Sequence, residues 1–217
     1  MTSERQYIRR LGAWRAAAYV GIAVAALILV SAAHAVTVGQ QAPGFTGKDS
    51  QGKAQLLKQY RGKYVVLEWT NRTCPFTKKH YDSGNMQALQ QQWTGKGVVW
   101  LTVLSSSPSH ASDGYMTGPE ENAYIEKVHA HPTAAILDPS GEIGREYGAK
   151  TTPHMFVIDP QGKLIYSGAI DDKATTDADD VKTARNYVSA ALSEAMAGQP
   201  VQVAATRPYG CSVKYGN

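Results

Sequence analysis

Residues 67–80 read Leu-Glu-Trp-Thr-Asn-Arg-Thr-Cys-Pro-Phe-Thr-Lys-Lys-His, so an apolar run stops, a cysteine follows, and an amphipathic segment begins. The run starts at Tyr64 and is rich in β-forming residues, which predicts a strand covered on both faces. Pro75 stands where the first residue of a helix is expected. Cys74 would then lie at a helix start, where unpaired backbone N–H groups favour the thiolate over the thiol. We therefore expect Cys74 to be a reactive thiol.

The rest of the chain alternates predicted strands and helices. Residues 36–62 are rich in turn residues, with a single helical turn expected over 56–60. Further helices are expected at about 75–95, 120–130, 142–147 and 177–198, and strands at 98–104, 133–137, 154–159 and 164–168. The last two strands flank a four-residue hairpin connection, so they should pair antiparallel at a sheet edge. This order predicts one α/β domain over 36–198 and a tail, 199–217, that carries Cys211.

The first 35 residues differ in composition from the remainder. A basic stretch precedes the uncharged run Ala16–Val30, and Ala33-His34-Ala35 follows, which is the layout of a secretory signal. We expect export, most simply to a bacterial periplasm, with cleavage after Ala35. An uncleaved membrane anchor that faces the periplasm is the alternative. Outside this segment basic and acidic side chains nearly balance, so no nucleic-acid partner is expected.

The order of strand, cysteine-led helix, strand, helix, Thr-Pro, hairpin and helix resembles the thioredoxin fold. The resemblance covers roughly residues 38–198 and is carried by 38–45, 62–69 and 152–162. These segments look most like the redoxins of the AhpC/TSA type, the branch with peroxiredoxins and exported thiol:disulfide reductases. Peroxiredoxin-like proteins with a C-terminal Tyr-Gly-Cys motif are especially similar. The resemblance implies a central mixed β-sheet flanked by helices, and a cis Pro153 that faces the cysteine.

The same resemblance implies an exported, peroxiredoxin-like thiol oxidoreductase with Cys74 as peroxidatic thiol and Cys211 as resolving thiol. A thiolate attacks the O–O bond of a hydroperoxide, and the sulfenic acid that forms condenses with a second thiol. A disulfide is the alternative substrate, with Cys74 as a single catalytic cysteine. A reducing thiol partner would restore the enzyme, and neither cofactor nor metal is implied. The tail could fold back or reach from a partner subunit, so a homodimer is compatible.

Two departures from the family patterns involve residues close to the cysteine. Thioredoxin-type reductases carry Cys-x-x-Cys, whereas Thr77 stands at the second position here and excludes a disulfide within that motif. Peroxiredoxins place Thr or Ser three residues before the cysteine and Pro seven before it, where this chain has Asn71 and Leu67. The Asn71 amide could donate a hydrogen bond instead. Thr77, Asn71 and Pro153 therefore join the two cysteines as candidate catalytic residues.

Four more residues are candidates for substrate binding. Trp69 and Arg72 precede the cysteine, and Thr152 and His154 flank the predicted cis proline. For Arg72 and His154, a plain surface or core position is the alternative. Two lysines, Lys78 and Lys79, either lower the thiol pKa from the first helical turn or simply point into water.

Two non-enzymatic alternatives remain open at this stage. A permanent Cys74–Cys211 bridge would tie the tail to the domain and contribute about 2–4 kcal/mol. A copper carrier that resembles the Sco-type assembly factors would use Cys74 with His80 or His154. The Cys-x-x-x-Cys pair of those carriers is missing, which counts against copper transport.

Overall fold

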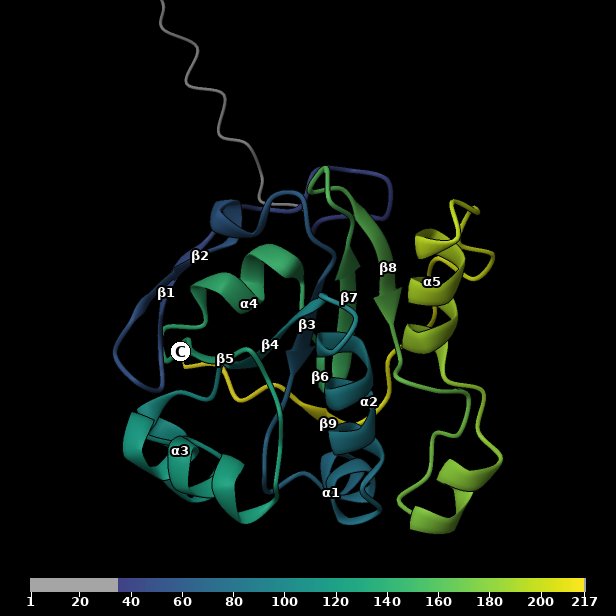
Figure 1. The fold of residues 1–217 in the computed structure, drawn as a ribbon. Coiled ribbons are helices and arrows are strands. Elements are labelled where there is room, and N and C mark those ends of the chain that lie inside the picture. Colours follow the sequence, from purple (N-terminus) through teal and green to yellow (C-terminus); the bar gives the residue numbers. More distant parts are fainter. Residues whose placement is uncertain (1–34, 217) are drawn as a thin grey trace, which may run out of the picture. The chain divides into compact units, whose positions relative to one another are not determined.

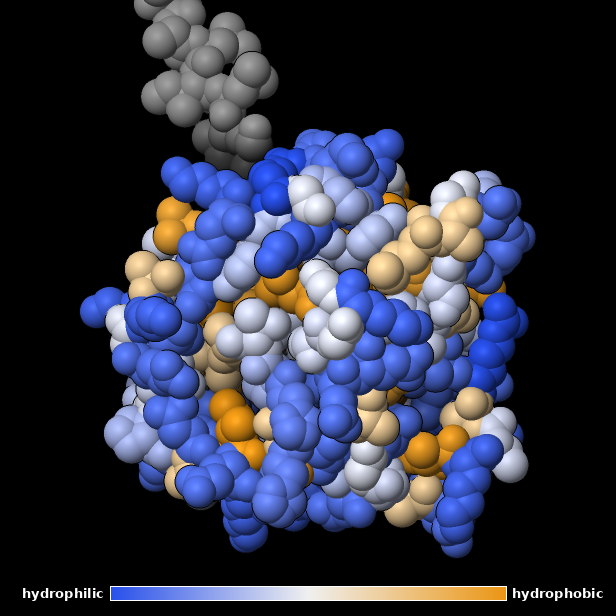
Figure 2. Space-filling view, in the orientation of Figure 1, coloured by the Kyte–Doolittle hydropathy of each residue, from blue (hydrophilic) through white to orange (hydrophobic). Residues whose placement is uncertain are grey.

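The computed structural model describes residues 35–216, so the predicted export segment lies outside the described residues apart from Ala35. Within 35–216, no helix has both the length and the apolar character that a membrane crossing requires. Figure 2 shows a mostly hydrophilic surface on the face in view, with small, separated apolar patches.

A seven-stranded mixed sheet forms the middle layer of the domain (Figure 1). In spatial order its strands are β2 (Ala54–Leu56), β1 (Thr46–Asp49), β5 (Ala134–Leu137), β4 (Val99–Leu104), β3 (Val65–Trp69), β7 (His154–Ile158) and β8 (Leu164–Gly168). β3 runs parallel to β4 on one side and antiparallel to β7 on the other. This interior place requires a strand that is apolar on both faces, as its sequence predicted.

Helices cover both faces of the sheet. Alternation along β3 sends Leu67 and Trp69 toward α4 (Glu142–Tyr147), whereas Val66 packs under α2 (Asn85–Thr94) and α5 (Tyr187–Met196). The helix that starts after Cys74 is α1 (Pro75–Asp82), and α3 (Gly118–Lys127) packs against β4 and β5. The short helices η1 (Leu57–Tyr60), η2 (Pro108–Asp113) and η3 (Ala178–Lys182) lie in the connections. The expected α/β thioredoxin-like fold is therefore confirmed.

Two predicted helices are each interrupted, which corrects the sequence-based boundaries. The segment 75–95 forms α1 and α2, separated at Gly84, whose φ of +75° is a left-handed conformation that glycine adopts readily. The segment 177–198 forms η3 and then α5. The Asn186 side chain caps α5 by accepting a hydrogen bond from the Ser189 backbone N–H (2.8 Å). In each segment the helical spacing of apolar residues continues across the interruption, so the sequence pattern did not reveal it.

The two edges of the sheet also differ in part from expectation. β8 forms one edge, but its hairpin partner β7 lies inside the sheet, between β8 and β3. The other edge is the antiparallel pair β1 and β2, which was not predicted. The strands have only four and three residues, so their sequences lack the long apolar run that marked the inner strands.

The tail of the chain folds back across the domain (Figure 1). Ala205 first pairs with Ser167 of β8, and the Thr206 hydroxyl oxygen accepts a hydrogen bond from the Ala169 N–H (2.9 Å). Beyond this contact, β9 (Cys211–Ser212) pairs antiparallel with β6 (Thr151–Thr152) and places Cys211 opposite Thr152. The same chain thus carries Cys211 to the segment before Pro153.

Candidate active site

Cys74 lies at the start of α1, buried beneath the tail. It is the residue that precedes the first turn of the helix, and only 2% of its surface is exposed. Its thiol donates a hydrogen bond to the carbonyl oxygen of Thr152 (2.9 Å). The Thr152–Pro153 bond is cis, which confirms that prediction. Because Thr152 also pairs with Cys211, a single residue contacts one cysteine directly and holds the other in a strand ladder.

The environment of Cys74 favours the thiolate. Burial raises the pKa of the Cys74 thiol, but interactions with the Cys211 thiol and with the Thr77 and Cys211 backbones outweigh it and lower the pKa overall. The Thr77 contribution comes from the start of α1, as the position of the cysteine predicted. Neither Lys78 nor Lys79 is among the causes of this shift, although Lys214 of the tail interacts electrostatically with Cys74.

Cys211 has the opposite preference. Burial, followed by the hydrogen bond to Cys74 and its negative charge, raises the pKa of Cys211 to about 12. Both cysteines are free thiols in this structure. Of the two thiols, Cys74 therefore loses its proton more readily.

Asn71 and Thr77 are both buried next to Cys74, but neither side chain is aimed at a substrate. The Asn71 oxygen accepts hydrogen bonds from the N–H and the hydroxyl of Thr73 (2.8 and 2.7 Å), and its amide donates to the Asp113 carbonyl (3.0 Å). Asn71 thus shapes the loop before the helix. Thr77 acts on Cys74 through its backbone, which the residue type alone could not reveal.

The candidate substrate-binding residues lie in different places, and only Thr152 contacts Cys74. Trp69 is fully buried and donates to the Ser105 hydroxyl (3.0 Å), so it belongs to the core and has no surface for a substrate. Arg72 lines a surface hollow beside α3. His154 is buried against Phe156, its Nδ1 accepts from the Lys150 N–H (3.2 Å), and burial lowers its pKa to about 3. Trp69 thus has a core position, whereas His154 also lines a surface hollow beside the tail, and its role in substrate binding stays a prediction.

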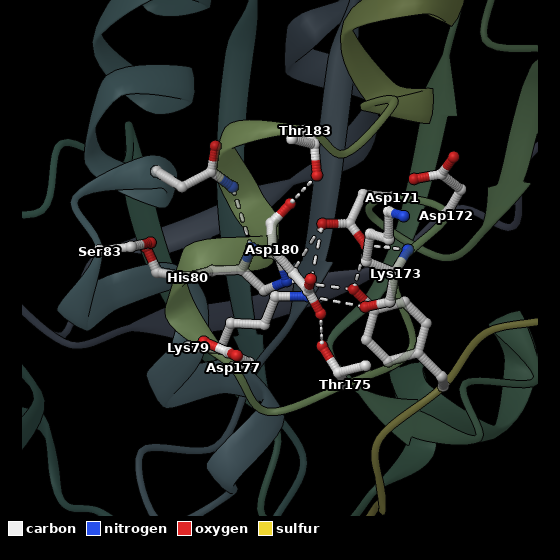
Figure 3. A network of polar contacts seen from close by, with 12 residues as sticks. Lys79, His80, Ser83, Asp171, Asp172, Lys173, Thr175, Asp177, Asp180 and Thr183 are labelled. Atoms are coloured by element: carbon white, nitrogen blue, oxygen red, sulfur yellow. Dashed lines mark hydrogen bonds and ion pairs between the residues drawn. The ribbon is translucent and has the colours of Figure 1, made fainter.

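A buried polar cluster joins α1 to the loop after β8, and Figure 3 shows Lys79, His80 and Asp171 converging there. Lys79 Nζ lies 3.8 Å from the Asp171 carboxylate and donates to the Lys173 carbonyl (2.7 Å). The alternative in which Lys79 points into water is therefore wrong. The tail enters the same cluster, because the Tyr209 hydroxyl donates to Asp171 Oδ1 (2.5 Å). Sequence reasoning missed this cluster, since its members are far apart in the chain.

A second buried cluster lies under the sheet on the α2 side. The Glu68 carboxylate accepts hydrogen bonds from the side chains of Tyr81 (2.8 Å), Gln90 (3.1 Å) and Trp100 (2.8 Å). Burial raises the pKa of Glu68. Burial and the nearby Glu68 charge raise the pKa of Glu121 to about 8. Glu68 is the one acidic residue in the otherwise apolar strand β3, and this feature of the sequence could have pointed to the cluster.

Metal binding finds no support in the described part of the chain. Across residues 35–216, no three His, Cys, Asp or Glu side chains are grouped in a way that could hold an ion. The copper-carrier alternative needs only two ligands, Cys74 with His80 or His154, and stays a prediction.

Comparisons with known proteins agree with the thioredoxin-like fold and with thiol redox chemistry. The model of the AhpC/TSA family matches residues 38–167. The chain is 27% identical over 128 residues to "Thiol-disulfide oxidoreductase ResA" of Bacillus thuringiensis subsp. konkukian, a match that covers 59% of this chain and 67% of the relative. The Bacillus subtilis protein of that name is 24% identical over 132 residues and is matched over 67% of its length.

Solved structures show the same fold at low sequence identity. A hypothetical protein from Sinorhizobium meliloti 1021 has a TM-score of 0.70 at 19% identity, with 84% of this chain and 97% of that chain covered. The thioredoxin domain of a thiol-disulfide oxidoreductase from Bacteroides vulgatus has a TM-score of 0.50 at 20% identity and is 98% covered. The family match ends before the tail that carries Cys211. From strand order, the cis proline and the matched family model together, the chain belongs to the AhpC/TSA family.

Proposed function

We propose that the protein is a thiol:disulfide oxidoreductase whose redox centre is the pair Cys74 and Cys211. The observation that carries this proposal is that Thr152 joins the two reduced thiols. It pairs with Cys211 in the ladder of β6 and β9, and its carbonyl accepts a hydrogen bond from Cys74, whose pKa is lowered. The similarity to proteins named thiol-disulfide oxidoreductases supports the same chemistry. Cys211 thus takes the part that the second cysteine of Cys-x-x-Cys has in thioredoxin-type reductases.

The proposed reaction proceeds in two exchange steps. The Cys74 thiolate attacks one sulfur of a substrate disulfide, which releases one thiolate and leaves a mixed disulfide on Cys74. Cys211 then loses its proton and attacks the Cys74 sulfur, which releases the second thiolate and closes the Cys74–Cys211 bond. The substrate gains the two electrons that the cysteine pair loses. A reducing thiol partner returns the pair to its starting state.

The two thiols change roles during this sequence for an electrostatic reason. The hydrogen bond to Cys74 and its negative charge are two of the causes that raise the pKa of Cys211. Both disappear once Cys74 is in a mixed disulfide, because its sulfur then carries no charge. Cys211 therefore becomes easier to deprotonate at the step in which it must attack.

Peroxide reduction is the second candidate. Membership of the AhpC/TSA family and the lowered pKa of Cys74 favour it. Against it, the Asn71 amide at the family's Thr or Ser position is engaged with Thr73 and Asp113. No arginine is among the groups that shift the Cys74 pKa. Disulfide exchange therefore fits the site better.

The test exposes the reduced protein to glutathione disulfide or to hydrogen peroxide and maps the cysteines by mass spectrometry. With the disulfide, we expect wild type to form the Cys74–Cys211 bond and Cys211→Ser to accumulate glutathione on Cys74. Cys74→Ser should react far more slowly. A Cys74 that stays unmodified by the disulfide in Cys211→Ser would refute the proposal. Faster reaction with peroxide than with any disulfide would favour the peroxidase.

We also infer export, and this inference rests on the composition of residues 1–35. A periplasmic location would give the pair an environment in which disulfides persist. Fractionation of cells that express the full chain, with the mass of the recovered protein, distinguishes cleavage after Ala35 from an uncleaved anchor. Recovery from the reducing cytosol would contradict export.

A further inference from the structure

Tyr209 lies two residues before Cys211 and contacts the helix that begins after Cys74. Its ring faces Phe76 of α1, with the ring centroids 5.8 Å apart. Its hydroxyl lies 3.2 Å from His80 Nε2, also on α1, and donates to Asp171. Tyr209 therefore links the segment that carries one thiol to the element that carries the other.

The hydrogen bonds of this cluster run in one direction toward Asp171. The Asn85 amide nitrogen lies 2.9 Å from His80 Nδ1, and burial lowers the pKa of His80 to about 3, so the ring is neutral. With Asn85 donating to Nδ1, the His80 proton resides on Nε2 and points at the Tyr209 oxygen. Tyr209 in turn donates its own proton to Asp171. Each member thus fixes the orientation of the next.

Asp171 needs the hydroxyl of Tyr209. Its carboxylate is only 2% exposed, and its other contacts are the Lys173 N–H (2.9 Å) and, at longer range, the Lys79 ammonium (3.8 Å) and His80 Nε2 (3.9 Å). A buried carboxylate is costly unless it is hydrogen-bonded and paired, and hydrogen bonds to charged acceptors are the stronger ones. Among the residues that the structure describes, Tyr209 is the one member of segment 207–210 whose side chain makes a hydrogen bond.

We propose that Tyr209 is a positioning residue for Cys211, acting through its hydrogen bond to Asp171. This inference rests on the dithiol exchange proposed above. The ladder of β6 and β9 holds Cys211 from one side. The Tyr209–Asp171 contact holds the preceding residues against α1. Together they keep the Cys211 sulfur beside Cys74 before the resolving step.

Loss of this contact should affect the two chemical steps unequally. Attack by Cys74 on an external disulfide does not require a docked tail. Release of the tail removes the Cys211 hydrogen bonds that lower the Cys74 pKa, but it also uncovers the buried thiol. Attack by Cys211 on the mixed disulfide requires the tail in its docked position. The Cys74–Cys211 bond forces docking, whereas the reduced protein can relax by releasing the tail. Removal of the hydroxyl should therefore disfavour the internal disulfide relative to the dithiol.

The test uses reduced full-length protein and an aromatic model disulfide whose released thiolate absorbs visible light. The first equivalent of thiolate reports attack by Cys74, and the second reports resolution by Cys211. In Tyr209→Phe we expect the second phase to slow about 10-fold, the size expected for loss of a hydrogen bond to a buried charge. The first phase should not slow. The equilibrium constant for oxidation of the dithiol to the Cys74–Cys211 disulfide by glutathione disulfide should fall about 10-fold. This fall corresponds to a reduction potential about 30 mV less negative.

Tyr64→Phe is the matched control, because it removes a hydroxyl that donates to the Ala195 carbonyl (2.9 Å), in a contact with α5. It should leave both phases unchanged. In an Asp171→Asn background, Tyr209→Phe should slow the second phase by less than about twofold. Three results would each overturn the inference. The second phase could be unchanged in Tyr209→Phe, both phases could slow equally, or Tyr209→Phe could have its full effect in the Asp171→Asn background. A wild type that releases no second equivalent would instead refute the proposed function.

Discussion

Glu121 keeps its proton in the folded protein at pH values where a free glutamate has lost it. Burial and the neighbouring Glu68 raise its pKa to about 8, from an ordinary value of 4.5. The unfolded chain therefore releases this proton at lower pH than the folded protein does. The protonated Glu121 carboxyl makes its full contribution to folding stability below pH 4.5, and this contribution is lost as the pH rises toward 8.

Glu121→Gln should remove this part of the pH dependence, because glutamine does not titrate. Between pH about 5 and 8, the free energy of unfolding of wild type should fall relative to the variant by up to about 1.4 kcal/mol per pH unit. Urea unfolding across that range measures the difference. Subtracting the variant's free energy of unfolding from that of wild type also cancels the contribution of the buried histidines, His80 and His154. Their lowered pKa values make stability rise with pH, which is the opposite sign.

Glu126→Gln is the control, since Glu126 is exposed on the same helix. Its stability curve should stay parallel to that of wild type. If the Glu121→Gln curve is parallel as well, Glu121 is ionised in the folded state and the assignment of a buried, protonated acid fails.

At the scale of elements, the two-residue strand β9 has more influence than its length suggests. It pairs with β6 directly before Pro153, and it covers Cys74. Its entry depends on Gly210, which has a φ of +131°. A Cβ atom added at Gly210 would lie 2.1 Å from the Thr152 carbonyl oxygen, a backbone atom that cannot move aside easily.

Gly210→Ala should therefore release β9 from β6. We expect the thiolate-specific alkylation rate of Cys74 in the reduced protein to rise at least about 10-fold, because loss of ~1.4 kcal/mol of docking energy populates the open form 10 times more. Closure of the internal disulfide should slow. Alkylation rates over a range of pH, with sites assigned by mass spectrometry, measure the first effect.

Gly198→Ala is the matched control for this substitution. Gly198 also has a positive φ, of +72°, but an added Cβ would meet no atom within 4 Å. It should cost roughly 1–2 kcal/mol of stability from backbone strain and leave the alkylation rate as in wild type. Equal rates in Gly210→Ala and wild type would show that β9 does not control access to Cys74.

For the whole molecule, most of the fold followed from local patterns, and most of the site did not. Apolar runs located β3, β4 and the β7–β8 hairpin because inner strands bury both faces. β1 and β2 escaped notice because strands of four and three residues are too short to show that pattern. The place of Cys211 depends on a ladder between β6 and β9, two segments far apart in the chain. Asp171 carries no motif, and the Tyr-Gly-Cys motif that begins at Tyr209 does not reveal its contact with Asp171, since only folding brings the two residues together.

The disulfide should also change the stability of the molecule as a whole. A Cys74–Cys211 bond would close a long loop and reduce the entropy of the unfolded chain. We expect the oxidised protein to be more stable than the reduced protein by about 2–5 kcal/mol in urea unfolding. Cys211→Ser should show the same stability with and without reductant. A reduced wild type as stable as the oxidised form would mean that the bond strains the folded state.

The ladder between β6 and β9 has a consequence for the order of events in turnover. In the thioredoxin-like fold, the residue before the cis proline offers its backbone to an extended substrate chain. Here that position, Thr152, is already paired with Cys211. Under the proposed disulfide exchange, a peptide and the tail would therefore alternate at one edge, so a peptide disulfide would have to leave the ladder before Cys211 could return. Small disulfides would escape this mutual exclusion, so we expect competition for the shared edge to select substrates by size.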